Sequence, residues 1–169
     1  IGGIILPLTT TPSRARVAAI EVYAEIDHLN EQAASLERVS PSQMLKKAQQ
    51  AHQLATTAGY AKGIARSLAQ MGKAHVRLGN LVEADQFLAQ AQASEVGDPQ
   101  LQGEIFSNRG INYIYSRVYD KAFAAFHQGL DLARNSGNQV LEAQLLNNIG
   151  EIYREHKDFA TAIAYYNQS

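Results

Sequence analysis

The chain contains no cysteine among its 169 residues. Disulfide bonds, thiolate metal sites and a cysteine nucleophile are therefore excluded. Because disulfides are a feature of oxidising compartments, their absence is compatible with the cytoplasm. A cytoplasmic location is what we predict.

Long hydrophobic stretches are also missing. The largely apolar segment 1–8 is far shorter than the about 20 residues that a membrane-spanning helix needs. No basic stretch precedes it. The sequence therefore predicts neither a membrane span nor a complete signal peptide.

Neither sign of charge dominates. Lys and Arg number 15 and Asp and Glu 16, which gives a formal net charge of -1. No global field attracts nucleic acid or an anionic membrane, so we expect neither as a partner. A hydrophobic content of 46% with 18% charged residues is typical of a folded globular chain rather than a disordered one.

Sequence signatures of catalysis are absent as well. The chain has no Gly-rich phosphate loop, no His-Glu-x-x-His and no Gly-x-Ser-x-Gly. Its five histidines are scattered, and no two lie three or four residues apart. Acid pairs such as Glu151 and Glu155 are expected on an exposed helix face, without a pocket to shift a pKa. We predict that the protein is not an enzyme and holds no metal ion or cofactor.

What the sequence does contain is a regular helical period. From residue 14 onward apolar residues recur every three or four positions, which indicates amphipathic helices. The pattern predicts helices over residues 14–37, 41–58, 61–78, 81–94, 99–116, 119–136, 139–156 and 159–168. No strand-like alternation competes with it, so the predicted fold class is all-α.

Turn residues mark the joints between these helices. Ser40 followed by Pro41 suits an N-cap and the first helical position. Glycine just past a helix end adopts the left-handed conformation that closes the last carbonyls. Four glycines lie at such places: Gly59, Gly79, Gly97 and Gly137. Residues 1–13, with two prolines and three threonines, are predicted to form an extended tether.

Three further glycines occupy the same place in a repeated pattern. Gly72, Gly110 and Gly150 are spaced by 38 and 40 residues, and each follows a joint glycine by 13 residues. Four positions recur after each glycine: His75, Leu81, Ala84 and Leu88; Tyr113, Tyr119, Ala122 and Phe126; and Tyr153, Phe159, Ala162 and Tyr166. Such periods indicate a stacked repeat, in which each unit needs its neighbour to bury an apolar face.

The position of these glycines inside helices has a physical reason. Glycine there costs about 0.5–1 kcal/mol relative to alanine, so its presence indicates that another helix approaches closely. We expect the alanine of each copy to be the small partner that permits this approach. The last large residue of each copy, together with Leu68, Phe106 and Leu146, is expected to fill the space between one pair and the next.

The pattern resembles the tetratricopeptide repeat, a helix-turn-helix unit whose consensus places glycine, tyrosine, alanine and a large aromatic residue at these offsets. The resemblance implies an α-α superhelix, or solenoid, of antiparallel helix pairs. It divides the chain into a degenerate leading pair over residues 14–58 and three repeats over 61–98, 99–138 and 139–169, the last truncated. The period near 40 residues is similar to the long-repeat subclass of kinesin light chains, spindle-orientation adaptors and bacterial signalling regulators.

The resemblance also implies a concave groove, lined by the first helix of each pair, that binds a protein or peptide. We expect ligand contacts from residues on that face: Arg66, Gln70, Lys73, Arg77, Asn108, Ile111, Tyr115, Asn147, Asn148 and Glu151. The alternative is that these are ordinary solvated side chains. The carboxylate clamp of the family's chaperone-tail readers is not expected, since Ala69 and Gln144 stand where two of its lysines would be.

Several functional hypotheses follow from this pattern. The first is a protein-interaction module, the regulatory or input part of a larger signalling protein, because the chain lacks an initiator methionine and stops inside a helical pattern. The alternative is a self-assembly module that forms a homo-oligomer through exposed end helices. In the last helix, Phe159, Ile163 and Tyr166 have no following repeat to cover them.

One residue departs from the pattern. Arg109 places a charge directly before the repeat glycine, where Met71 and Ile149 are apolar. Either its side chain snorkels along the helix pair or the packing changes locally.

Overall fold

The computed structural model describes residues 13–94 and 96–169, and this part of the chain contains helices and no strands. The helices are α1 (Arg14–Ser35), α2 (Pro41–Ala58), α3 (Ala61–Leu78), α4 (Leu81–Ala93), α5 (Pro99–Tyr115), α6 (Tyr119–Asn135), α7 (Gln139–Glu155) and α8 (Phe159–Tyr166). The predicted tether lies outside the described residues, except for Ser13, which caps α1. The all-α prediction is confirmed.

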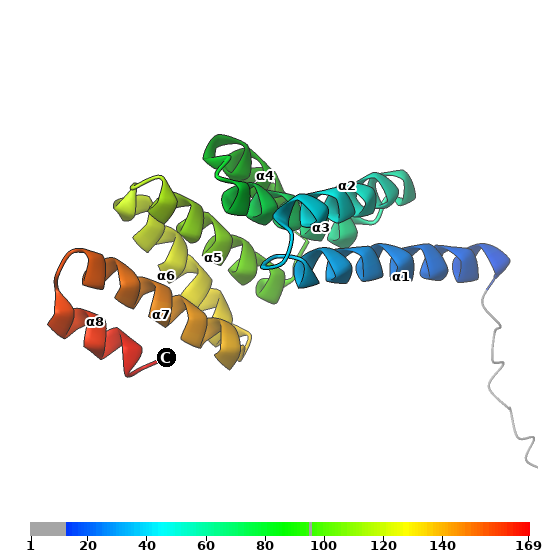
Figure 1. The fold of residues 1–169 in the computed structure, drawn as a ribbon. Coiled ribbons are helices and arrows are strands. Elements are labelled where there is room, and N and C mark those ends of the chain that lie inside the picture. Colours follow the sequence, from blue (N-terminus) through cyan, green and yellow to red (C-terminus); the bar gives the residue numbers. More distant parts are fainter. Residues whose placement is uncertain (1–12, 95) are drawn as a thin grey trace, which may run out of the picture.

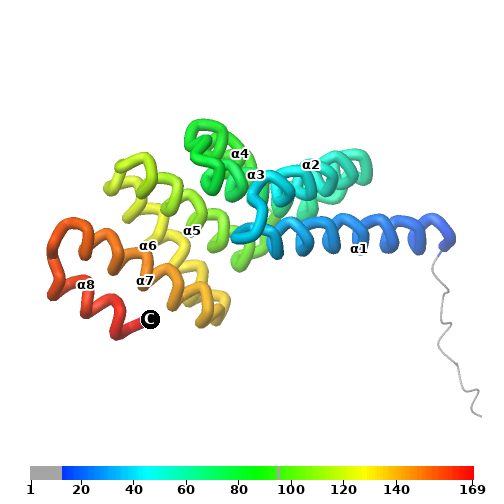
Figure 2. Tube along the Cα trace, viewed as in Figure 1, coloured from blue at the N-terminus to red at the C-terminus, as the bar shows by residue number. Residues whose placement is uncertain are grey.

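Successive helices lie side by side and reverse direction at each turn, so that antiparallel pairs follow one another (Figure 1). Each odd-numbered helix also packs against the next odd-numbered one, α1 on α3, α3 on α5 and α5 on α7. The odd-numbered helices thus form one continuous row. The tube in Figure 2 follows the array from α1 at one end to the C-terminus near the other. This arrangement is a helical-repeat solenoid.

The helix ends largely follow the predicted turn chemistry. The four joint glycines all have positive φ. Pro41 begins α2 as predicted, but the Ser40 side chain makes no capping hydrogen bond. Arg117 and Lys157 have φ of 58° and 64°, at the places where the first copy has Gly79. The second and third copies therefore hold a non-glycine residue in a conformation that favours glycine.

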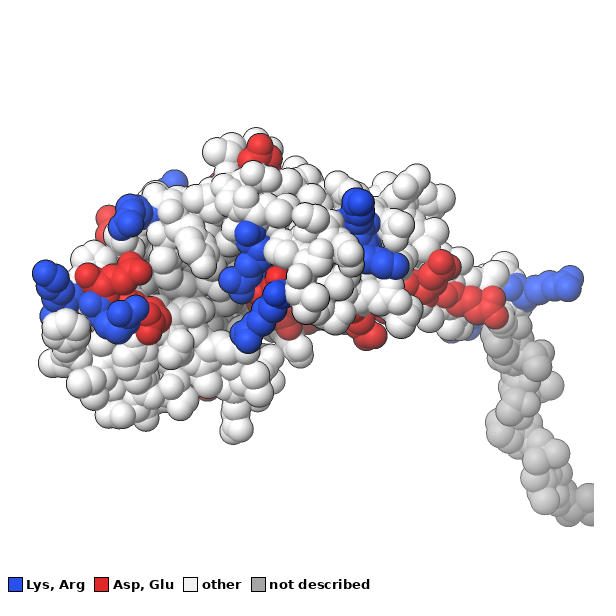
Figure 3. Space-filling model, in the orientation of Figure 1, with Lys and Arg blue, Asp and Glu red and all other residues white. Residues whose placement is uncertain are grey.

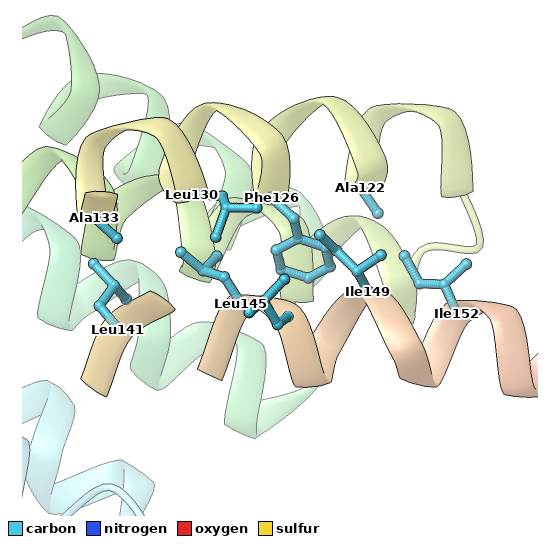
Figure 4. Close-up of a cluster of buried hydrophobic side chains, with 9 residues drawn as sticks. Ala122, Phe126, Leu130, Ala133, Leu141, Leu145, Ile149 and Ile152 are labelled. Atoms are coloured by element: carbon cyan, nitrogen blue, oxygen red, sulfur yellow. The ribbon is translucent and has the colours of Figure 1, made fainter. Parts of the chain in front are cut away.

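The hydrophobic core crosses the boundaries between helix pairs. Its largest cluster joins α6 to α7, where Phe126 is fully buried above Leu145 and Ile149 (Figure 4). A second cluster joins α3 and α4 to α5, and a third joins α1 and α2 to α3. No pair therefore buries its apolar face alone, as a stacked repeat requires.

Each repeat glycine lies against the last large residue of its own copy. The pairs are Gly72 with Leu88, Gly110 with Phe126 and Gly150 with Tyr166. The alanines were expected to be the small partners that permit the approach, and all three are buried. Among the three atoms nearest to a Cβ at each glycine, the carbonyl oxygen of Ala84, near Gly72, is the one that belongs to these alanines. The glycine makes room for a large side chain of the second helix rather than for a small one.

Alanine at these glycines should destabilise the fold to different degrees. A Cβ at Gly72 would lie 2.5 Å from Leu88 Cγ and 3.2 Å from the carbonyl oxygen of Ala84. We expect Gly72→Ala to lower the free energy of unfolding by about 1–3 kcal/mol, because backbone as well as side chain must shift. Gly150→Ala should cost less, since the three atoms nearest to its Cβ all belong to the ring of Tyr166 in the last helix. Urea unfolding followed by circular dichroism measures both, and equal losses would contradict this explanation.

Candidate functional site

A groove of about 430 Å³ lies along the row of odd-numbered helices. Most of its lining side chains are polar, and they come from α3, α5, α7 and the residue that caps α7. They are Arg66, Ala69, Gln70, Lys73, Gln100, Leu101, Glu104, Ser107, Asn108, Asn138, Val140, Leu141 and Gln144. Because α5 packs on both α3 and α7, side chains far apart in the sequence converge here.

The groove contains part of the predicted contact set. Arg66, Gln70, Lys73 and Asn108 line it. Six predicted residues lie outside its lining: Arg77, Ile111, Tyr115, Asn147, Asn148 and Glu151. No observation tests ligand contact at any of the ten, so their binding role stays a prediction.

Some lining residues were missed by the sequence reasoning. Gln100 and Val140 lie in the first turns of α5 and α7, and Asn138 caps α7. A usable signal was present, because Gln100 and Val140 precede Glu104 and Gln144 by one helical turn and so share their face.

Glu37, in the connection between α1 and α2, neutralises two of the predicted ligand-binding cations. Its carboxylate lies 2.5 Å from Lys73 Nζ and also pairs with the Arg77 guanidinium. Burial raises the pKa of Glu37, but hydrogen bonds from Lys73 and Arg77, together with their charges, outweigh it and hold the pKa below its usual value. Two of the three basic side chains that the sequence predicted to contact a ligand from α3, Lys73 and Arg77, are therefore paired within the protein.

Arg66 is a groove cation without an ion pair to the described residues, 13–94 and 96–169. Lys62, one turn earlier in α3, instead pairs with Asp98 at 2.8 Å. Basic and acidic side chains lie next to one another on the face seen in Figure 3, without a continuous patch of either sign. The groove thus offers Arg66 and Glu104 as charged side chains without an ion pair to the described residues, within a polar surface.

The amide side chains of the groove fall into two groups. Asn138 accepts a hydrogen bond from the Leu141 amide, and Gln100 donates to Glu104. Gln70, Asn108 and Gln144 make no side-chain hydrogen bond with the described residues. Within that part of the chain, Gln70 Oε1 is buried and has no donor. An unpaired buried acceptor costs free energy that a ligand donor would recover.

The predicted residues outside the groove have other contacts or are open to solvent. Glu151 accepts hydrogen bonds from Arg154 and from the hydroxyl of Tyr166, so it joins α7 to α8. Ile111 is partly buried and packs against two core clusters. Tyr115, at the end of α5, is exposed.

The described residues offer neither a metal site nor a membrane-spanning helix. They contain no group of three or more histidine, cysteine, aspartate or glutamate side chains arranged to hold a metal ion. Within the same ranges, every helix is too short or too polar to cross a membrane.

The family model of the tetratricopeptide repeat matches residues 101–169, from the first turn of α5 to the last residue. This part of the chain is thus similar to the tetratricopeptide repeat family, whose members are generally protein-interaction modules and typically non-catalytic. A search of curated proteins found no match. The division into three repeats and the long-repeat subclass stay predictions.

The ion pairs of Glu37 predict a pH-dependent stability. Because its pKa is lower in the folded than in the unfolded chain, these pairs stabilise the fold above the unfolded pKa. This contribution is lost as the pH falls through the folded pKa. We expect Glu37→Gln to lower the free energy of unfolding by about 1 kcal/mol at neutral pH, and by far less at about pH 3.

Glu31→Gln is the matched control, because Glu31 is exposed in α1, shortly before Glu37, and forms no ion pair with the described residues. Urea unfolding over a series of pH values measures both variants. If the difference between Glu37→Gln and the parent stayed constant with pH, the assignment of the stabilisation to these pairs would be wrong.

Proposed function

We propose that the chain is a protein-interaction module that binds a peptide segment of a partner in the groove of α3, α5 and α7. The observation that carries this proposal is the set of uncommitted amides, Gln70, Asn108 and Gln144, contributed by three successive helices to one groove. An amide side chain both donates and accepts hydrogen bonds, as a peptide backbone does. A main-chain segment is therefore the ligand that matches this lining.

Charge adds a second element of recognition. Arg66 is the cation without an ion pair to the described residues, and Lys73 lies nearby but is held by Glu37. A ligand with one acidic residue near α3 satisfies Arg66 without displacing Glu37. A strongly acidic ligand competes with Glu37 for Lys73, so Glu37 lowers the affinity of the groove for such ligands.

We place this module in the regulatory part of a larger cytoplasmic signalling protein, without catalytic activity of its own. The similarity of residues 101–169 to the family supports the interaction role. The binding mode and the signalling context rest on the groove chemistry and on the resemblance to long-repeat regulators.

A second candidate function is self-assembly through α8. Phe159 and Ile163 in this helix are 58% and 57% exposed, so they present an apolar surface. If copies associate there, sedimentation velocity will show a larger species as concentration rises, and Ile163→Asp will restore the monomer. A single species of monomer mass at all concentrations eliminates this candidate.

Removal of the groove amides tests the leading proposal. A peptide ligand is first selected from a displayed random library, and its affinity is measured by fluorescence anisotropy. We expect Gln70→Ala combined with Asn108→Ala to weaken binding by about 10- to 30-fold, since each lost hydrogen bond contributes about 1 kcal/mol.

Asn135→Ala, which removes an exposed amide at the end of α6, is the matched control and should bind as the parent does. Unchanged affinity in the double variant, with an unchanged circular dichroism spectrum, rules out the groove as the binding site.

A further inference from the structure

Arg109 replaces an apolar contact between helix pairs. The residue before the repeat glycine is Met71 in the first copy and Ile149 in the third, and both are buried in clusters that join neighbouring pairs. The Arg109 side chain is 20% exposed and contacts α4 instead. Its guanidinium donates to Gln92 through Nη1 and to Asp85 through Nη2, at 3.3 Å in the second case. The packing therefore changes locally, which was one of the two sequence-based interpretations.

This change leaves a small pocket between α5 and α6. The pocket has a volume of about 170 Å³. Phe106 and Ala125 supply apolar lining, and Arg109, Tyr113, Lys121 and Gln128 supply polar lining. The residues equivalent to Phe106 in the other copies, Leu68 and Leu146, are buried, whereas Phe106 is only partly buried.

The pocket carries more positive than negative charge. Arg109 Cζ and Lys121 Nζ lie 5.5 and 5.7 Å from the centre of the Tyr113 ring. Lys121 pairs with no carboxylate of the described residues, and Asp85, the partner of Arg109, is 43% exposed. Within the same residues, Arg109 Nε is buried and has no acceptor. Lys121 thus has no anion among the described residues. Arg109 is paired with Asp85 and also donates to the Tyr113 hydroxyl, yet its buried Nε–H lacks an acceptor.

The pocket faces away from the groove of the proposed function. Each residue of an α-helix turns by about 100°, so Arg109 and Tyr113 lie about 140° around α5 from Glu104 and Asn108. Glu104 and Asn108 line the groove, and Arg109 and Tyr113 line the pocket. Ligands therefore reach the two sites from different sides of α5.

We propose that this pocket is a second binding site, which takes the side-chain carboxylate of a glutamate from a protein partner. The carboxylate oxygens accept hydrogen bonds from Arg109 Nε and Lys121, and the methylene groups lie on Phe106 and Ala125. The volume holds about five or six groups the size of a water molecule, which matches the five non-hydrogen atoms of a glutamate side chain. A phosphate group lacks the apolar stem that this lining matches.

The test is an NMR titration of the intact chain with N-acetyl-glutamate N-methylamide, which carries one carboxylate. We expect saturable shifts of the Arg109 Nε–H signal and of backbone amides of α5 and α6 near the pocket, with a Kd in the millimolar range. The glutamine analogue should cause none. Lys121→Gln should weaken binding by about fivefold, and Arg109→Met should abolish it. Methionine is chosen because Met71 occupies the equivalent buried place in the first copy.

Lys73→Gln, which removes a groove cation, is the control and should leave this titration unchanged. Equal shifts with the glutamine analogue, or unweakened binding in Lys121→Gln, would overturn the proposal. Tighter binding of the phosphoserine analogue would identify a phosphate site and overturn the carboxylate assignment.

Lys121 is exposed, so its variant remains informative if Arg109→Met fails to fold. Lys121→Gln leaves the groove intact, so failure here does not affect the peptide-binding proposal.

Discussion

In each copy of the pattern, a glycine of the first helix lies against a large side chain of the second. Gly110 is the central example, because any side chain there would overlap the ring of Phe126. This contact sets how closely the two helices approach and which way each is rotated about its axis. The opposite side of the first helix is then directed to the row of odd-numbered helices that carries the groove. The groove exists because the glycine allows this packing.

The charges of the groove are controlled by the chain itself. Glu37 comes from the connection before α2, yet it pairs with Lys73 and Arg77 of α3. A cationic stripe on α3 thereby becomes a mostly neutral surface. Polar recognition through amides, Arg66 and Glu104 is the chemistry that remains. Such a surface favours ligands for their backbone geometry more than for their net charge.

Helix α5 is the element on which both proposed sites depend. One of its faces contributes Glu104 and Asn108 to the groove, and another contributes Arg109 and Tyr113 to the pocket beside α6. The polar cluster around Arg109 occupies the place where other copies have an apolar contact between pairs. Because one rigid helix carries both faces, each ligand meets a preformed surface.

The helices and their joints were determined by the sequence alone, because an apolar period and turn residues act locally. The resemblance to the tetratricopeptide repeat implied that the first helices of the pairs line one groove, and α3, α5 and α7 do pack in one row. Four groove residues, among them Gln70 and Asn108, followed from that resemblance. The pairing of Glu37 with Arg77 was decided only by the tertiary structure, since the two residues are 40 positions apart. Arg109 stood out in the sequence, but its partners on α4 did not. Such contacts depend on the angle and offset at which neighbouring pairs stack, and a local period carries no information about either.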